Sequence, residues 1–150
     1  MLKYKIMDTR IKSYLDLTKE ELYDLLALRI EVFVIEQNCP YQDLDGVDKT
    51  AYHLITNDGV ATVATLRIYI DNNNVVHIGR VVVAQTHRKT RLGRLIMSKA
   101  IDWSKNNYSE REIHISAQQY LDDFYTNLGF KSTGKKYLED GIPHQEMILL

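Results

Sequence analysis

The chain has 150 residues, of which 45% are hydrophobic and 26% are charged, and its formal net charge is −1. This length allows one domain with a hydrophobic core, and the composition is that of an ordinary globular protein rather than a disordered or fibrous one. The nearly neutral charge argues against a general nucleic-acid or membrane-surface binder, because such proteins need a broad basic face. We therefore expect a single domain over residues 1–150, with no nucleic-acid and no membrane partner.

The single cysteine, Cys39, cannot form an internal disulfide, and the sequence has no Cys/His pattern with zinc-ligand spacing. The first residues, MLKYKIMDTRIK, lack the apolar core of a signal peptide. No window approaches the ~18 apolar residues of a membrane span. These features predict a cytoplasmic protein that binds no metal.

The first predicted element is a helix from Thr18 to about Glu36. Thr18 and Glu21 have the spacing of a capping box, and Leu22, Leu25, Leu26, Arg29 and Phe33 recur at helical spacing. The segment NCPYQDLDGVDKT, residues 38–50, reads as a long irregular loop of a kind that is often functional. Its DLDGVD stretch does not fit a calcium loop, because the glycine is misplaced and the twelfth-position glutamate is missing.

Residues 51–83 are rich in β-branched side chains and are interrupted by turn residues at 57–59 and 71–74, which predicts three strands in an antiparallel meander. A second helix is expected over about residues 91–106, a strand over 112–117 and a helix over 118–130 that closes near Gly129. A terminal hairpin over 135–150 should turn at Asp140-Gly141. The fold class is therefore mixed α/β, a mostly antiparallel twisted sheet flanked by helices, with its parallel part around Val81 to Ala117.

Cations gather where the third of these strands turns into the second helix. The stretch VVVAQTHRKTRLGRLIM places Arg88, Lys89, Arg91 and Arg94 around Gly93. A helix start exposes N–H groups without intrahelical partners and carries partial positive charge, so this turn suits a diphosphate. The alternative is a solvated surface turn, and the stretch matches neither a Walker loop nor the three-glycine dinucleotide fingerprint.

Two motifs identify a known family. The stretch RKTRLG resembles the Arg/Gln-x-x-Gly-x-Gly/Ala motif of the GNAT superfamily of acyl-CoA-dependent N-acyltransferases. The stretch FYTNLGF resembles a second sequence motif of that superfamily. Their order, about thirty residues apart with one strand between them, is more specific than either motif alone. LRIEVFVIEQNCPYQDLDGVDKTAYH and EDGIPHQEM are similar to the ElaA-like branch of the superfamily, so the resemblance spans most of the chain.

The resemblance implies acetyl-CoA, or coenzyme A, as the co-substrate. Backbone groups of the strand would bind the pantetheine arm and the acyl carbonyl, the basic turn would hold the pyrophosphate, and the start of the next helix would add one contact. The implied coenzyme-binding residues are Val81, Val82, Val83, Arg88, Lys89, Thr90, Arg91, Leu92, Gly93, Arg94 and Gln118. Arg91 stands where the motif has its first glycine, so it is either strained at a positive φ or tolerated in a helical conformation.

The implied activity is N-acetyl transfer to a primary amine by direct attack in a ternary complex. Tyr125 matches the tyrosine that donates a proton to the coenzyme thiolate in many family members, and a phenol is a reasonable acid for that step. A thiol nucleophile formed by Cys39 with His53 is a weaker interpretation. The alternative function is a non-catalytic module that senses acyl-CoA or binds a protein.

No general base can be copied from the family, because VVHIGRVVV offers only His77 and Arg80. The candidates are Glu36, Asp43, Asp45, Asp48, His53, His144 and Glu146, acting directly or through water. As a group they make the acceptor side acidic, which favours a small-molecule or peptide acceptor that is cationic. Exposed strands at a sheet edge also make a homodimer plausible.

Overall fold

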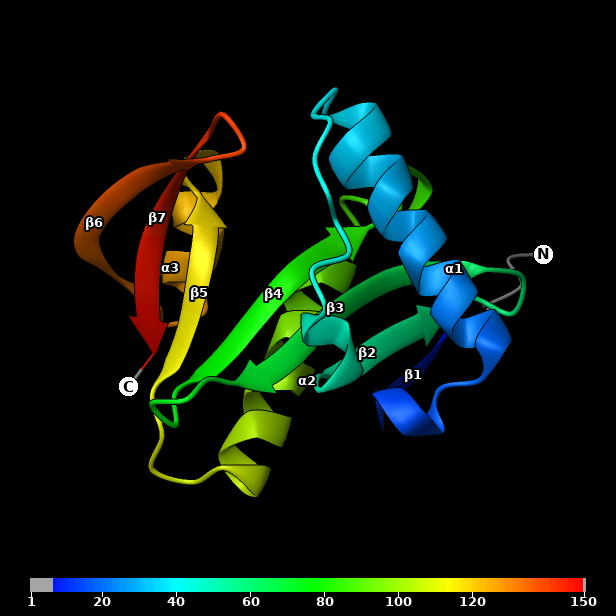
Figure 1. The fold of residues 1–150 in the computed structure, drawn as a ribbon, viewed down its shortest axis with the longest axis horizontal. Helices are drawn as coiled ribbons and strands as arrows, with labels where there is room; N and C mark the ends of the chain where they lie inside the picture. The colour runs from blue at the N-terminus through cyan, green and yellow to red at the C-terminus, as the bar shows by residue number, and fades with distance from the viewer. Residues whose placement is uncertain (1–6, 150) are drawn as a thin grey trace.

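The computed structural model describes residues 7–149, which form one seven-stranded sheet with helices on both faces (Figure 1). The strands are β1 Asp8–Ser13, β2 Tyr52–Asn57, β3 Thr62–Ile70, β4 Val76–Val83, β5 Ile113–Gln118, β6 Lys131–Glu139 and β7 Ile142–Leu149. Their order is β1-β2-β3-β4-β5-β7-β6, and β4 with β5 is the parallel pair. The mixed, mostly antiparallel sheet predicted from the sequence is confirmed.

The first long helix begins as its sequence predicts. Thr18 accepts from the Glu21 N–H at 3.1 Å and Glu21 accepts from the Thr18 N–H at 2.9 Å, which completes the capping box. Helix α1 is α-helical over Lys19–Arg29 and continues as a π-helix, η2, over Ile30–Glu36. The predicted end at Glu36 is therefore correct, but the last turns are wider than an α-helix.

The first strand of the sheet was not predicted. Strand β1 pairs antiparallel with β2 along its whole length, from Asp8 opposite Asn57 to Ser13 opposite Tyr52. Its sequence, DTRIKS, has one large apolar residue, so it shows no hydrophobic run. An edge strand needs little apolar surface, and charged side chains on it hinder pairing with another chain.

The predicted meander is confirmed as β2, β3 and β4. Both faces of β3 are covered, and residues 63–68 are buried without interruption. Helix α1 lies over one face of this part of the sheet, and helix α2, Leu92–Asn107, lies over the other (Figure 1). Ala64, Leu66 and Ile68 pack with Ile96, Met97 and Ala100 of α2 in the main core.

The region after β5 differs from the prediction. Gln118 is the last residue of β5 rather than an early residue of a helix, and a 3₁₀ turn, η5 Gln119–Leu121, precedes the short helix α3, Asp122–Asn127. The expected closure by Gly129 is confirmed by its φ of 102°. The terminal hairpin begins at Lys131, earlier than predicted, and its turn lies at Asp140-Gly141 as expected.

Strands β4 and β5 meet only at one end. Their parallel register is limited to Val76 with Ile113 and His77 with His114. Beyond this junction the two strands diverge, as Figure 1 shows. The open edge of β4 that results is the feature of the fold that positions the site.

Candidate functional site

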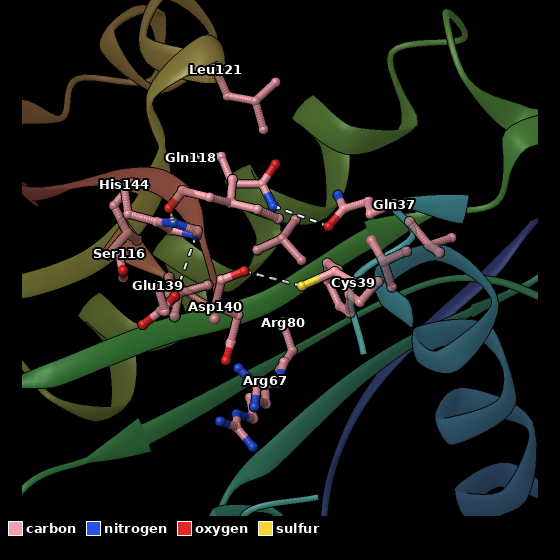
Figure 2. A pocket seen from close by; sticks show the side chains of 18 of the residues that line it. Gln37, Cys39, Arg67, Arg80, Ser116, Gln118, Leu121, Glu139, Asp140 and His144 are labelled. Carbon is pink, nitrogen blue, oxygen red and sulfur yellow. Dashed lines mark hydrogen bonds and ion pairs between the residues drawn. The ribbon is translucent and has the colours of Figure 1, made fainter. Parts of the chain in front are cut away.

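A cleft of 630 Å³ occupies the space where β4 and β5 diverge. Residues 77–83 of β4 line one wall, and Ser116 and Gln118 of β5 with residues of β7 line the other. The end of η2 and the β6–β7 turn approach each other over the cleft. There Gln118 donates to Gln37 Oε1 at 3.4 Å, and the Cys39 thiol donates to the Asp140 carbonyl at 3.3 Å (Figure 2).

The upper half of β4 turns backbone groups toward the cleft rather than toward another strand. Two residues of β4, Arg80 and Val81, lie opposite the single residue Leu66 of β3, which is a β-bulge, and Arg80 has a φ of 49°. The Ala84 N–H donates to Val63 on β3 at 2.8 Å. Because backbone groups alternate sides along a strand, those of Val83 and Val81 face the cleft, whereas those of Val82 face β3.

The start of α2 presents a run of free N–H groups at the end of that edge. Among the described residues, the backbone N–H groups of 89 to 94 have no hydrogen-bond acceptor, and the first bond of α2 runs from Leu95 to the Arg91 carbonyl. Gly93 lies against Phe124 and Val83, where a Cβ would make ordinary contacts at 3.6 and 3.8 Å. This geometry, with the surrounding cations, is that of an anion-binding helix start.

Of the two conformations considered from the sequence, Arg91 has the strained one with a positive φ. It is the N-cap of α2 with φ 64° and ψ 10°, the left-handed conformation, and its side chain makes no cap hydrogen bond. Lys89 also has a positive φ, of 63°. Arginine thus replaces the glycine of the family motif, but the backbone stays in the left-handed conformation. That conformation costs a residue other than glycine about 1–2 kcal/mol.

Arg88 links the end of β4 to the end of η2. Its Nε donates to the Val83 carbonyl at 3.1 Å, and its guanidinium lies 2.7 Å from the carboxylate of Glu36. Glu36, a candidate base, therefore already has a cationic partner. An anion at the start of α2 would compete with Glu36 for Arg88.

Tyr125 of α3 lines the cleft and is 7% exposed. Its ring packs edge-on against Phe124 and Phe130. Burial raises the pKa of the Tyr125 phenol above its usual value, with a smaller contribution from Tyr120. Its hydroxyl makes no hydrogen bond to any residue from 7 to 149, so the proton stays on the phenol and is available to a ligand.

The aspartates of the 38–50 loop are held by arginines. Arg29, 1% exposed, donates to Asp43 at 2.8 Å and to Asp48 at 2.7 Å. Arg67 makes a bidentate contact with Asp45 at 2.8 and 2.7 Å and a third bond to Asp48 at 3.1 Å. The third arginine is Arg80, whose Nε lies 2.9 Å from Asp43 Oδ1 in an ion pair without hydrogen-bond alignment. The charges of the three arginines therefore balance those of the three aspartates.

These contacts make the loop aspartates poor proton acceptors. The hydrogen bonds from Arg67, opposed by burial, lower the pKa of Asp45 to about 2. Burial raises the pKa of Asp48, but the hydrogen bond and charge of Arg29 and the charge of Arg67 outweigh it and leave the pKa lowered. The acidic acceptor side expected from the sequence is therefore largely neutralised by Arg29, Arg67 and Arg80.

The remaining candidate bases separate by position. His53 is 0% exposed and its Nε2 is 2.9 Å from the Asp48 carbonyl, while burial lowers its pKa. His53 does not line the cleft, and neither does Glu146, which accepts from Thr133 at 3.2 Å. His144 does line it, with Glu139 Oε2 3.3 Å from its Nε2 (Figure 2).

Two cleft residues were missed from the sequence, Arg67 and Glu139. Arg67 interrupts a buried apolar strand, and a charge in such a place signals a buried ion pair. Arg29 on the apolar face of the first helix carries the same signal. Glu139 has no such signal, because it depends on the hairpin register that brings it to His144.

Within residues 7–149 no group of three His, Cys, Asp or Glu side chains is arranged to hold a metal ion. The same part of the chain contains no helix that is long and apolar enough to cross a membrane.

Comparisons with known proteins agree with this geometry. Residues 15–150 match the family model described as acetyltransferase (GNAT) domain. A UPF0039 protein of Schizosaccharomyces pombe is 41% identical over 140 residues, which cover 92% of this chain and 93% of the relative.

Two crystal structures are similar along nearly the whole chain. One is an acyl-CoA N-acyltransferase from Pseudomonas aeruginosa, with 38% identity, a TM-score of 0.90, and coverage of 95% of this chain and 99% of the other. The second is ElaA of Escherichia coli, with 35% identity, a TM-score of 0.91, and coverage of 97% of this chain and 100% of the other.

Proposed function

Because the chain belongs to the acetyltransferase (GNAT) domain family, whose fold supports acyl transfer from acyl-CoA, we propose that it moves an acetyl group from acetyl-CoA to a primary amine. The observation that carries this proposal is the continuity of the open β4 edge with the free N–H groups at the start of α2. A long, thin ligand with a phosphate end matches both parts. We further propose that residues 1–150 form one such domain and that it works in the cytoplasm.

The backbone of Val81 and Val83 fits the role of an added strand partner. Their N–H groups and the Val81 carbonyl face the cleft, and a pantetheine arm carries amides that can pair with them, whereas the Val83 carbonyl accepts from Arg88. The N–H groups of residues 89–94 then hold the pyrophosphate, with Arg88, Lys89, Arg91 and Arg94 supplying charge. Gln118, on the opposite wall at the end of β5, contributes a polar contact from its side chain.

The chemical roles fall to groups at the wide part of the cleft. The Val81 N–H, which faces the cleft, would donate to the thioester oxygen as negative charge develops there. Tyr125 donates to the sulfur as the carbon–sulfur bond breaks. Since its pKa is raised, full proton transfer to the thiolate is uphill, so its main contribution is a hydrogen bond that strengthens as the thiolate forms.

We propose direct attack by the amine rather than an acyl-enzyme. Cys39 lines the cleft, but its thiol donates a hydrogen bond to the Asp140 carbonyl. Within residues 7–149 no basic side chain contacts this thiol. After neutralisation of the loop aspartates, Glu139 and Asp140 remain as acidic groups at the acceptor end. They favour an acceptor with a second positive charge.

The test is release of coenzyme A thiol from acetyl-CoA with three amines of similar length: butylamine, 1,4-diaminobutane and 4-aminobutanoate. We expect transfer to the first two, with the highest kcat/KM for the diamine. Transfer to 4-aminobutanoate alone would rule out the cationic acceptor. Binding of acetyl-CoA without turnover of any amine would favour the non-catalytic acyl-CoA module, to which the strained Arg91 and the engaged Arg88 give some support.

The same assay tests Tyr125. We expect Tyr125→Phe to keep acetyl-CoA affinity and to lower kcat by about 10–100-fold, since one hydrogen bond to a charged group is worth about 1.5–3 kcal/mol. Because the raised pKa keeps the phenol protonated, the ratio of wild-type to variant kcat should stay constant from pH 6 to 9. A ratio that changes with an inflection in that range would assign Tyr125 a different role.

A further inference from the structure

We propose that His144 is the general base that deprotonates the acceptor amine, and that Glu139 is the positioning residue that stabilises its protonated form. This rests on the proposed amine acetylation. A lysine-like amine is only about 1 part in 2,500 neutral at pH 7, so the reaction needs a proton acceptor in the cleft. Of the candidates, Glu36 and the loop aspartates face arginines, and His53 and Glu146 lie outside the cleft.

His144 lies at the level of the free β4 edge. Counting from the last parallel pair, His77 with His114, four residues along β4 leads to Val81, and four along β5 leads to Gln118. Gln118 pairs with His144 on β7. Val81 and His144 both line the cleft beyond this junction, whereas His77 belongs to the junction itself, at the closed end of the cleft.

The hydrogen bonds of His144 fix its tautomer. Its Nδ1 is 2.7 Å from the Ile142 carbonyl, an oxygen that can only accept, so Nδ1 carries a hydrogen. In the neutral ring Nε2 therefore has the lone pair, and Nε2 is the atom near the Glu139 carboxylate at 3.3 Å. A proton taken up at Nε2 is then shared with a carboxylate, as in a His–Glu pair built to hold imidazolium.

Uncharged side chains from β5, β6 and η5 also surround the His144 ring. Tyr137 of β6 stacks on it with a centroid separation of 6.2 Å and an angle of 19°, and burial raises the pKa of that phenol, so it stays neutral. The neighbouring positions of β5 are the uncharged Ser116 and Gln118, and η5 contributes Gln119, which donates to the His144 carbonyl at 3.0 Å.

Glu139 of β6 contacts His144, and Asp140 of the following turn and the exposed Tyr120 also line this end of the cleft. A positive charge formed on His144 would therefore face the Glu139 carboxylate.

The proton transfer is simple to balance. An N–H bond of the substrate ammonium breaks, and the proton bonds to His144 Nε2, which leaves the lone pair on the amine nitrogen for attack. Glu139, with a side chain 48% exposed, can give way to the substrate and then compensate the imidazolium charge. The proton leaves to solvent after the product departs.

The experiment compares His144→Gln, Glu139→Gln and His114→Gln in the thiol-release assay across pH 5.5–9.5. His114 is a matched control, because its Nε2 lies 2.7 Å from Glu112 in another His–Glu pair that does not line the cleft. We expect His144→Gln to lower kcat/KM by ~10²–10⁴-fold and to remove the fall of activity on the acid side. His114→Gln should stay within twofold of wild type.

Glu139→Gln provides the second readout and changes a side chain that is 48% exposed. Removing its negative charge makes protonation of His144 less favourable, so the acid limb of the kcat/KM profile should move to lower pH. The melting-temperature shift caused by acetyl-CoA should be retained in all three variants, which separates base function from folding and coenzyme binding.

The outcomes distinguish the two proposals. Wild-type turnover with an unchanged pH profile in His144→Gln, or an unmoved acid limb in Glu139→Gln, would overturn the role of His144 and leave amine acetylation standing. Failure of the wild type to acetylate any amine would overturn both. Loss of activity together with loss of the acetyl-CoA melting shift would show that His144 serves the fold, and would also overturn its role as base.

Discussion

At the residue scale, Arg91 shows how a family motif can change its side chain while its backbone stays the same. A glycine at this place permits the left-handed conformation without cost, and Arg91 keeps that conformation at φ 64°. What the position gains is one more cation beside the free N–H groups of α2. Folding stability therefore favours glycine at this position, whereas anion binding favours arginine.

Arg91→Gly tests this conflict. Removing the strain should outweigh the added entropy of glycine in the unfolded chain, for a net gain of about 0.5–1 kcal/mol and a melting temperature about 1–4 °C higher. Arg94→Gly is the matched control, because Arg94 is inside the helix and glycine there costs about 1 kcal/mol. Equal destabilisation by both substitutions in thermal melts would show that Arg91 is not strained.

At the element scale, the 38–50 loop illustrates what a sequence can and cannot disclose. Its irregular character was predictable from Pro40 and Gly46, but its acidic residues suggested catalysis, whereas they serve to fix the loop. The partners come from α1, β3 and β4, and pairing over such distances depends on tertiary packing. Strand β1 was missed for a related reason, since its place in the sheet follows from β2 rather than from its own residues.

The loop cluster predicts a loss of stability in acid. The folded pKa of Asp45 is about 2 against an ordinary 3.8, so its carboxylate stabilises the fold above pH 3.8 and that contribution is lost as pH falls through about 2. Asp45 is one-third exposed, and allowing for solvent screening its contribution is about 1–2 kcal/mol.

Asp45→Asn should lose that contribution at pH 6 and flatten the dependence of unfolding free energy on pH between 4 and 2, measured by urea denaturation. Asp8→Asn is the control, because Asp8 and Arg10 form an exposed pair, with side chains 55% and 61% exposed. Its effect should stay below about 0.5 kcal/mol. A slope that is the same in Asp45→Asn and wild type would remove Asp45 from the acid response.

At the scale of the whole molecule, the fold and its family could be read from the sequence, but the chemistry of the acceptor side could not. The strand-to-helix turn and the FYTNLGF motif are local patterns, and the structure places both along the same cleft. The pairing of His144 with Glu139 depends on hairpin register, and the neutralised aspartates depend on long-range ion pairs. These are properties of the packed chain that spacing along a sequence does not encode.

Acetyl-CoA binding should stabilise the molecule as a unit. At about 100 times the dissociation constant, binding adds ~2.7 kcal/mol, or roughly 5–10 °C in melting temperature. Adenosine diphosphate, which reaches only the start of α2, should give a smaller shift. No shift with either ligand in a thermal melt would mean that the basic turn is only a solvated surface.

The short junction between β4 and β5 also has a mechanical consequence. The sheet consists of two blocks, β1 to β4 and β5 to β7, joined by two residue pairs at one end, in the manner of a hinge. A ligand that forms hydrogen bonds with the open edge of β4 would occupy the cleft between the two blocks and restrict their relative motion. The co-substrate would then hold the two blocks together, and the amide hydrogens of Val81 and Val83 should exchange more slowly when it is bound.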